Sequence, residues 1–107
     1  MGRSDQRFEY NSLSSEQGNS VAMCNLGYCY EKGIGTDENK TKAFELYEKS
    51  ANIGNCPAMK NVGSYYEYGW GGVTKDLNKA RECYTKAAAQ GCTGAQKALD
   101  ELNAQEE

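Results

Sequence analysis

Histidine is absent from this 107-residue sequence, and no two cysteines have the CxxC spacing. Structural zinc sites use cysteine and histidine ligands at short spacings, so we predict no metal site. The sequence also lacks a GxSxG nucleophile motif and a phosphate-binding glycine loop that leads from a strand into a helix. No pair of carboxylates stands out from the many along the chain. We therefore predict that the protein is not an enzyme and uses no cofactor.

Long apolar runs are missing as well. No segment approaches the roughly 20 apolar residues of a membrane span, and the opening MGRSDQRFEY lacks the apolar segment of a secretory signal. The net charge is -3 and the basic residues are scattered, unlike those of a nucleic-acid-binding surface. These absences predict a cytoplasmic protein that binds neither membranes nor nucleic acids.

The sequence does contain five cysteines, an odd number that cannot pair completely within one chain. Because no signal peptide is present, we expect a reducing compartment and free thiols. Cys24 and Cys29 are predicted to lie on different faces of one helix. Cys56 opens another helix, and Cys83 and Cys92 flank a turn between helices. We interpret most of these side chains as small apolar residues.

The strongest pattern is an internal repeat. The segment LGYCYEKGIG (26–35) returns as VGSYYEYGWGG (62–72). The matched pairs, each 36 residues apart, are Gly27 and Gly63, Tyr30 and Tyr66, Gly33 and Gly69, and Gly35 and Gly71. A repeat period of roughly 20 to 50 residues is typical of a solenoid.

Apolar residues at helical spacing predict the helices of this repeat. We expect one over residues 19–32, a second from about residue 39 that Gly54 closes, and a third over 56–68. A fourth lies between the cap Asp76 and Gly91. A last helix is predicted to start at Thr93, whose hydroxyl would form a capping box with Gln96.

Residues 1–17 are polar and rich in serine, which favours a short or frayed helix. When the repeat is projected backwards, Phe8 falls at the position of Phe44, and Tyr10 falls at that of Leu46. We therefore interpret this segment as a decayed second helix of an earlier repeat, which would cap the exposed edge of the stack.

The pattern Ala-x-x-x-Leu-Gly-x-x-Tyr-x-x-Gly-x-Gly, followed by Lys-Ala-x-x-x-Tyr-x-Lys-x-Ala-x-x-Gly, resembles the Sel1-like repeat, a relative of the tetratricopeptide repeat. The first copy is read at Ala22, Leu26, Gly27, Tyr30, Gly33, Gly35, Lys42, Ala43, Tyr47, Lys49, Ala51 and Gly54. The second copy is read at Ala58, Gly63, Tyr66, Gly69, Gly71, Val73, Asp76, Lys79, Ala80, Tyr84, Lys86, Ala88 and Gly91. The resemblance implies an all-α fold, a short right-handed α-solenoid of antiparallel helix pairs.

We divide the chain into a polar N-terminal segment (1–17), two Sel1-like repeats (18–54 and 55–91) and a C-terminal capping helix (92–107). Ala95 and Leu99 match the opening helix of a third unit. The chain departs from the family pattern at Thr36, where valine is preferred, in the extra glycine of GWGG, and at Asp100, where glycine is usual.

We expect most motif residues to be structural. The glycines and alanines would let helices approach closely, and the tyrosine hydroxyls would reach water or a backbone carbonyl. Trp70, in a glycine-flanked loop, has two readings: it shields the helix pair beneath it, or it forms a binding contact.

By analogy with related repeats, the first helices line a concave groove that binds a partner peptide or helix. The predicted groove residues are Cys24, Tyr28, Glu31, Lys32, Lys60, Ser64, Glu67, Tyr68, Lys97 and Glu101. Lys60 and Lys97 would lie on neighbouring helices about 10 Å apart and hold an acidic side chain or a terminal carboxylate. The alternative is that they are surface lysines paired with Glu67 and Glu101.

The leading hypothesis is a scaffold or adaptor, monomeric or weakly dimeric, that binds a protein or peptide partner. A second hypothesis is a redox-responsive assembly or quality-control factor, since cysteine-rich relatives link neighbouring repeats by disulfides. Cys83 and Cys92 have no counterparts at Leu46 or Asn55, which weighs against that reading. A fixed subunit of a larger complex is the third.

Overall fold

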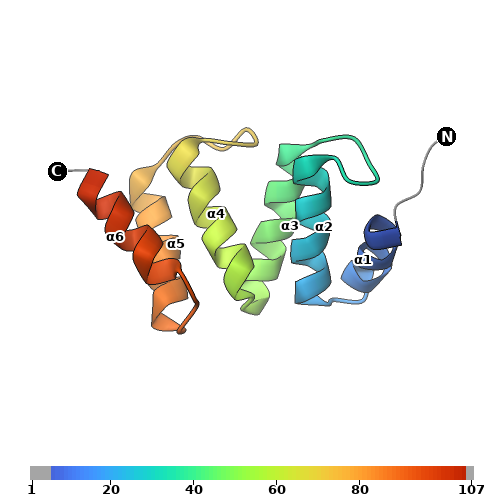
Figure 1. Ribbon diagram of the computed structural model, residues 1–107, viewed down its shortest axis with the longest axis horizontal. Coiled ribbons are helices and arrows are strands. Elements are labelled where there is room, and N and C mark those ends of the chain that lie inside the picture. Colours follow the sequence, from blue (N-terminus) through green and yellow to red (C-terminus); the bar gives the residue numbers. More distant parts are fainter. Residues whose placement is uncertain (1–5, 106–107) are drawn as a thin grey trace.

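Six helices make up the part of the chain that the computed structural model describes, residues 6–105. They are α1 (Gln6–Glu16), α2 (Ser20–Lys32), α3 (Lys40–Ile53), α4 (Cys56–Tyr68), α5 (Leu77–Ala89) and α6 (Ala95–Gln105). Each helix packs on its neighbours in the sequence, so the molecule extends 50 Å along one axis and only 24 and 17 Å along the others (Figure 1). The predicted all-α solenoid is confirmed.

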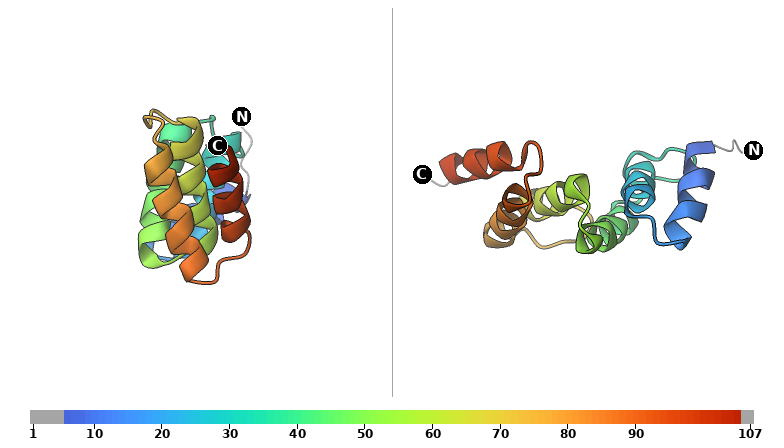
Figure 2. Two further views of the ribbon diagram at one scale, coloured as in Figure 1. Left: turned by 90° about the vertical axis from the view of Figure 1, so that its left-hand side faces the viewer. Right: turned by 90° about the horizontal axis from the view of Figure 1, so that it is seen from below.

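The helices fall on two sides of this row. α2, α4 and α6, the first helices of successive repeats, lie along one side, and α3 and α5 lie along the other (Figure 2, right). We call these the first-helix side and the second-helix side.

The helix boundaries follow capping residues in the sequence. Asn19, Asn39 and Asn55 each accept a hydrogen bond from a backbone N–H in the first turn of α2, α3 or α4, and Asp76 does the same for α5. One boundary prediction is wrong. Residues 92–94 form a turn and α6 begins only at Ala95, so Thr93 and Gln96 form no capping box. The Gln96 side chain instead donates a hydrogen bond to Asp100.

A glycine–tyrosine contact joins the two helices of each repeat. A Cβ atom at Gly27 would lie 2.8 Å from the ring of Tyr47, and one at Gly63 would lie 2.7 Å from the ring of Tyr84. Both tyrosines are 1% exposed. The predicted role of the two glycines is therefore confirmed: only a residue without a side chain lets these rings pack flat on the first helix.

The α1 helix occupies the place of a second helix, as the backward projection predicted. Phe8 packs edge-on against Tyr30 of α2, with ring centroids 5.6 Å apart. Phe44 of α3 packs edge-on against Tyr66 of α4 in the same way, at 5.7 Å. The two pairs are one repeat apart, so α1 relates to α2 as α3 relates to α4.

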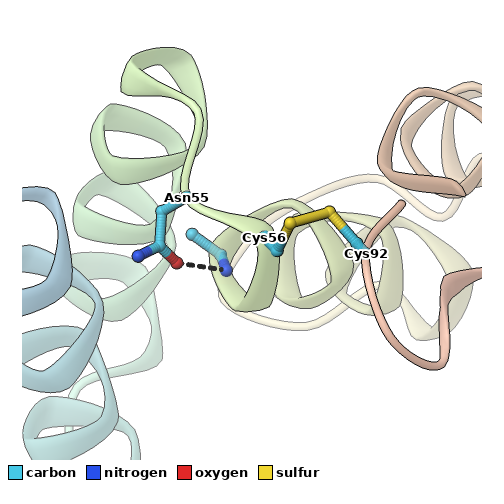
Figure 3. Close-up of a disulfide and its surroundings, with 4 residues drawn as sticks. Asn55, Cys56 and Cys92 are labelled. Atoms are coloured by element: carbon cyan, nitrogen blue, oxygen red, sulfur yellow. Dashed lines mark hydrogen bonds between the residues drawn. A yellow bond between two sulfur atoms is a disulfide. The ribbon is translucent and has the colours of Figure 1, made fainter. Parts of the chain in front are cut away.

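A disulfide joins Cys56 to Cys92 (Figure 3). Our expectation that no disulfide forms is therefore wrong for these two residues, whereas Cys24, Cys29 and Cys83 take part in no disulfide. Cys56 opens α4, and Cys92 lies in the turn before α6. Because α4 and α5 are antiparallel, the chain returns to the end of α4 where it began, and two residues 36 apart in sequence come within 5.4 Å between Cα atoms. In the sequence we looked for a cysteine at Asn55, the repeat counterpart of Cys92. The partner of Cys92 is the next residue, Cys56, so the pairing was not recognised.

Candidate partner-binding surface

The predicted groove residues divide into an exposed set and an inward set. Tyr28, Lys32, Tyr68, Lys97 and Glu101 are exposed, and Lys60 and Ser64 are half-buried. Cys24 and Glu67 are buried, and the side chain of Glu31 is 17% exposed. The prediction that all ten side chains face a groove is thus wrong for Cys24, Glu31 and Glu67.

Glu31 is turned inward because two tyrosine hydroxyls need an acceptor. Its Oε1 accepts a hydrogen bond from Tyr47 of α3 and another from Tyr65 of α4, both at 3.0 Å. Burial, together with the Glu31 carboxylate, raises the pKa of both tyrosines above the usual value of 10. We call this arrangement the Glu31 clamp, since one carboxylate of α2 holds side chains from the next two helices. We expected the tyrosine hydroxyls to reach water or a backbone carbonyl, but Tyr47 and Tyr65 both donate to the carboxylate of Glu31.

Glu67 has the same place in the second repeat but fewer partners. It accepts a 2.8 Å hydrogen bond from the hydroxyl of Tyr84, which also lies 3.1 Å from Ser64 Oγ. The residue of α6 that corresponds to Tyr65 is Leu102, which is fully buried and has no hydroxyl. Glu67 therefore links α4 to α5 through Tyr84. Unlike Glu31, it has no hydroxyl to bind on the next first helix, because Leu102 stands where Tyr65 stands one repeat earlier.

Cys24 belongs to the core that α2, α3 and α4 share, where it packs with Tyr47 and Tyr65. Its thiol is 4.0 Å from the Asn61 side-chain amide. Burial, and secondarily the charge of Glu31, raises the pKa of this thiol above its usual value. A buried thiol that resists ionisation is a structural group, so we remove Cys24 from the binding surface.

The most prominent exposed feature is a pair of aromatic side chains at the end of α4. Tyr68 and Trp70 stack with ring centroids 4.9 Å apart, and they are 55% and 38% exposed. Trp70 also packs edge-on against the buried ring of Tyr65 at 5.4 Å. Trp70 thus covers Tyr65, in agreement with the shielding interpretation, while part of its surface remains open.

The loop that carries Trp70 is docked on α3. The hydroxyl of Thr41 donates a hydrogen bond to the carbonyl of Gly71 at 3.2 Å. A Cβ atom at Gly71, where φ is +63°, would lie only 2.7 Å from the carbonyl oxygen of Lys40. Glycine is needed here both for the backbone conformation and for the close approach. The aromatic pair is consequently held by α3 as well as by α4.

Lys60 and Lys97, the predicted pair, come from the N-terminal halves of α4 and α6. Lys60 reaches the turn before α6, where its Nζ lies 3.0 Å from the position of a Cβ at Gly94. Lys97 is exposed on the first turn of α6. Within residues 8–105 neither lysine forms an ion pair, so the alternative pairing with Glu67 and Glu101 is not observed. Their separation of about 10 Å stays a prediction.

Taken with the fold, these contacts define a short helical-repeat protein whose repeated pattern of glycine and tyrosine is structural. A family model described as the Sel1 repeat matches residues 20–55 and 56–92, more than half of the chain. The chain belongs to the Sel1 repeat family.

Solved structures agree with this assignment. A Sel1 repeat protein from Oxalobacter formigenes is 39% identical, with a TM-score of 0.81 over 87% of this chain and 69% of that one. The Escherichia coli protein c5321, a protective antigen of uropathogenic strains, is 38% identical, with a TM-score of 0.85 over 92% of this chain and 21% of that one. Helicobacter pylori cysteine rich protein B is 26% identical, with a TM-score of 0.78 over 86% and 68%. No curated protein matches the chain.

Sel1 repeat proteins are generally scaffolds for protein interactions and are typically not enzymes. In the described part of this chain, no helix is both long and apolar enough to cross a membrane.

Proposed function

We propose that this protein is an interaction scaffold that binds a peptide or helix of a partner protein on its first-helix side. The observation that carries the proposal is the stacked pair of Tyr68 and Trp70, exposed but held in place by Tyr65 and by the loop on α3. Rigid, partly exposed aromatic side chains are enriched among the residues that dominate binding at protein interfaces.

The proposed contact residues are those of the ten predicted groove residues whose side chains are exposed or half-buried and do not turn inward. They are Tyr28, Lys32, Lys60, Ser64, Tyr68, Lys97 and Glu101, with Trp70 beside them. The ammonium of Lys32 lies 6.0 Å from the ring centre of Tyr28, so α2 offers an aromatic group next to a cation as well. Cys24, Glu31 and Glu67 support this surface from within.

Affinity capture followed by mass spectrometry tests the proposal in two steps. Wild-type protein first identifies the partner, and two variants are then compared with it: Tyr68→Ala with Trp70→Ala, and Lys60→Glu with Lys97→Glu. Each should lose most of the capture while its circular dichroism stays helical. The matched control Lys49→Glu with Lys86→Glu carries the same charge change on the second-helix side and should capture the same partner normally. Unchanged capture by both test variants would exclude this side.

The Cys56–Cys92 disulfide favours a second candidate function, a factor whose interactions depend on redox conditions. Disulfides persist in oxidising compartments, which argues for such a location over the cytoplasm that we first expected. Thiol titration of unreduced, denatured protein should find three thiols, and five would overturn this candidate. Partner capture that is equal with and without reductant would show that the bond is structural only.

A further inference from the structure

Two of the hollows on the second-helix side are repeats of one another. The larger, hollow two, has a volume of about 270 Å³ and lies between α3 and α5 over α4. Hollow one, of about 190 Å³, lies between α2 and α3. The shared lining of hollow two is Val62, Tyr66, Lys79, Glu82, Cys83 and Lys86. The corresponding lining of hollow one is Leu26, Tyr30, Lys42, Glu45, Leu46 and Lys49. All six pairs are 36 or 37 residues apart, which is one repeat.

The floor of each hollow is built in the same way. A tyrosine of the first helix lies at the bottom, and a lysine of the second helix reaches over its ring. Lys42 Nζ is 5.9 Å from the ring centre of Tyr30, and Lys79 Nζ is 5.4 Å from that of Tyr66. This cation–π contact holds each ammonium at the edge of an apolar surface.

The lysines around the hollows are available to a ligand. Lys42, Lys49, Lys79 and Lys86 belong to the repeat motif, yet the glycine–tyrosine contacts between the helices do not use them. Within residues 8–105 none of the four forms an ion pair. In hollow one Lys42 and Lys49 flank Glu45, so its lining carries an excess of positive charge. In hollow two Lys79 and Lys86 flank Glu82, and Glu48 of α3 adds a second carboxylate to the lining. The protein as a whole has a net charge of -3, so an acidic ligand is repelled overall and attracted only where such lysines gather.

The size of the hollows limits what they can hold. Sites for small molecules generally measure about 300–1,000 Å³, and both hollows are smaller. Each has room for about one side chain. Two such hollows, repeated with the period of the protein, suit a ligand that is itself a chain and supplies one side chain to each.

We propose that the second-helix side docks an acidic segment of a partner protein that carries two apolar side chains, each next to a carboxylate. The apolar side chains enter the hollows against Tyr30 and Tyr66, and the carboxylates meet the lysines at the rims. The lysines of the hollows belong to α3 and α5, which lie on the opposite side of the solenoid from α2, α4 and α6 (Figure 2, right), so a single protein can hold two partners.

Synthetic peptides test the proposal directly. Fluorescent peptides with one Leu–Glu pair, or with two pairs separated by 2 to 10 glycine and serine residues, are titrated with the protein and followed by fluorescence polarisation. Binding to both hollows at once should make the best two-pair peptide at least ten times tighter than the one-pair peptide, because the second contact becomes intramolecular. Equal affinity at every spacing would overturn the proposal, as would an absence of binding.

Charge reversals then assign the hollows. Lys42→Glu with Lys49→Glu, and Lys79→Glu with Lys86→Glu, should each reduce the affinity of the two-pair peptide to the one-pair level. The matched control Lys40→Glu with Lys75→Glu should leave it unchanged, and circular dichroism verifies that all variants are folded. Equal losses in control and test variants would show that only net charge matters and would refute the site. The variant Lys60→Glu with Lys97→Glu should bind these peptides normally, which separates this proposal from the first-helix surface.

Discussion

The two repeats hold the next repeat in place by different means. In the first, the Glu31 clamp links α2 to α4 through Tyr65. Inside that repeat, Ser50 of α3 also donates a 2.6 Å hydrogen bond to the carbonyl of Ser20 of α2. In the second, Leu102 and the fully buried Ala87 occupy the places of Tyr65 and Ser50, and both hydrogen bonds are lost. The Cys56–Cys92 disulfide, at the position of Ser20, links α4 to the turn before α6 instead.

This difference shows that a repeat fixes a packing geometry without fixing its chemistry. Both repeats keep the glycine–tyrosine contact inside the helix pair, because no other residue fits under the ring. The contact between one repeat and the next is less restricted in its chemistry. A carboxylate that accepts a hydrogen bond links α2 to α4, and a disulfide links α4 to the turn before α6. We expect the first junction to respond to alkaline pH and the second to reductant.

Truncating the central tyrosines should have the largest effect. Tyr47→Ala and Tyr84→Ala each remove a ring that is 1% exposed, and such changes usually cost about 3–5 kcal/mol of unfolding free energy. We expect Tyr84→Ala to be the more damaging, because the buried carboxylate of Glu67 loses the hydroxyl of Tyr84, whereas Glu31 keeps the hydrogen bond from Tyr65. Urea unfolding followed by circular dichroism measures the difference, and equal losses would contradict the ranking.

Removing the disulfide should come next. Cys56→Ser with Cys92→Ser opens a loop with a sequence separation of 36 residues, which is expected to cost about 2–4 kcal/mol. The loss should be concentrated in α5 and α6, since the Glu31 clamp is untouched. Hydrogen exchange should therefore speed up in α6 more than in α2. The control Cys83→Ser alters a free thiol and should leave the exchange of α6 unchanged.

Alkaline pH should weaken the first junction more than the second. The pKa values of Tyr47, Tyr65 and Tyr84 are raised in the folded protein, whereas an unfolded tyrosine titrates near pH 10. Above about pH 10 the unfolded chain releases protons that the folded chain retains. Each such tyrosine then costs about 1.4 kcal/mol per pH unit, and the contribution is fully present below pH 10.

The phenylalanine variants separate the two junctions. Tyr47→Phe with Tyr65→Phe should lower the slope of unfolding free energy between pH 10 and 11 by about twice as much as Tyr84→Phe, because two buried hydroxyls are removed in place of one. The measurement is urea unfolding at each pH. If the three variants keep the wild-type slope, the buried hydroxyls are not its source.

The sequence predicted what depends on neighbours within one repeat. The helices, their asparagine and glycine ends and the glycine–tyrosine contacts all follow from the 36-residue period. It did not predict Glu31, because a lone glutamate among charged residues resembles a solvated position. Its place four residues after Gly27 puts it on the face that meets α3, which is a usable signal. Cys56 and Cys92 are separated by 36 residues, which is one repeat, and this spacing was a usable signal for the disulfide. The hollows depend on side chains of three helices, which no single helical pattern reveals.

The smallest effect concerns the two hollows, which differ at one charged position. Glu48 of α3 lines hollow two, and Ser12 of α1 has the corresponding place beside hollow one. A carboxylate at the rim opposes an acidic ligand, and exposed charges interact by about 0.2–1 kcal/mol. Glu48→Gln should therefore tighten a one-pair Leu–Glu peptide by about 1.4- to fivefold. The change is made in the background Lys42→Glu with Lys49→Glu, which leaves only hollow two. Fluorescence polarisation measures the change. Asp37→Asn, in an exposed loop, makes the same charge change elsewhere, and an equal gain there would show that Glu48 acts only through the net charge of the protein.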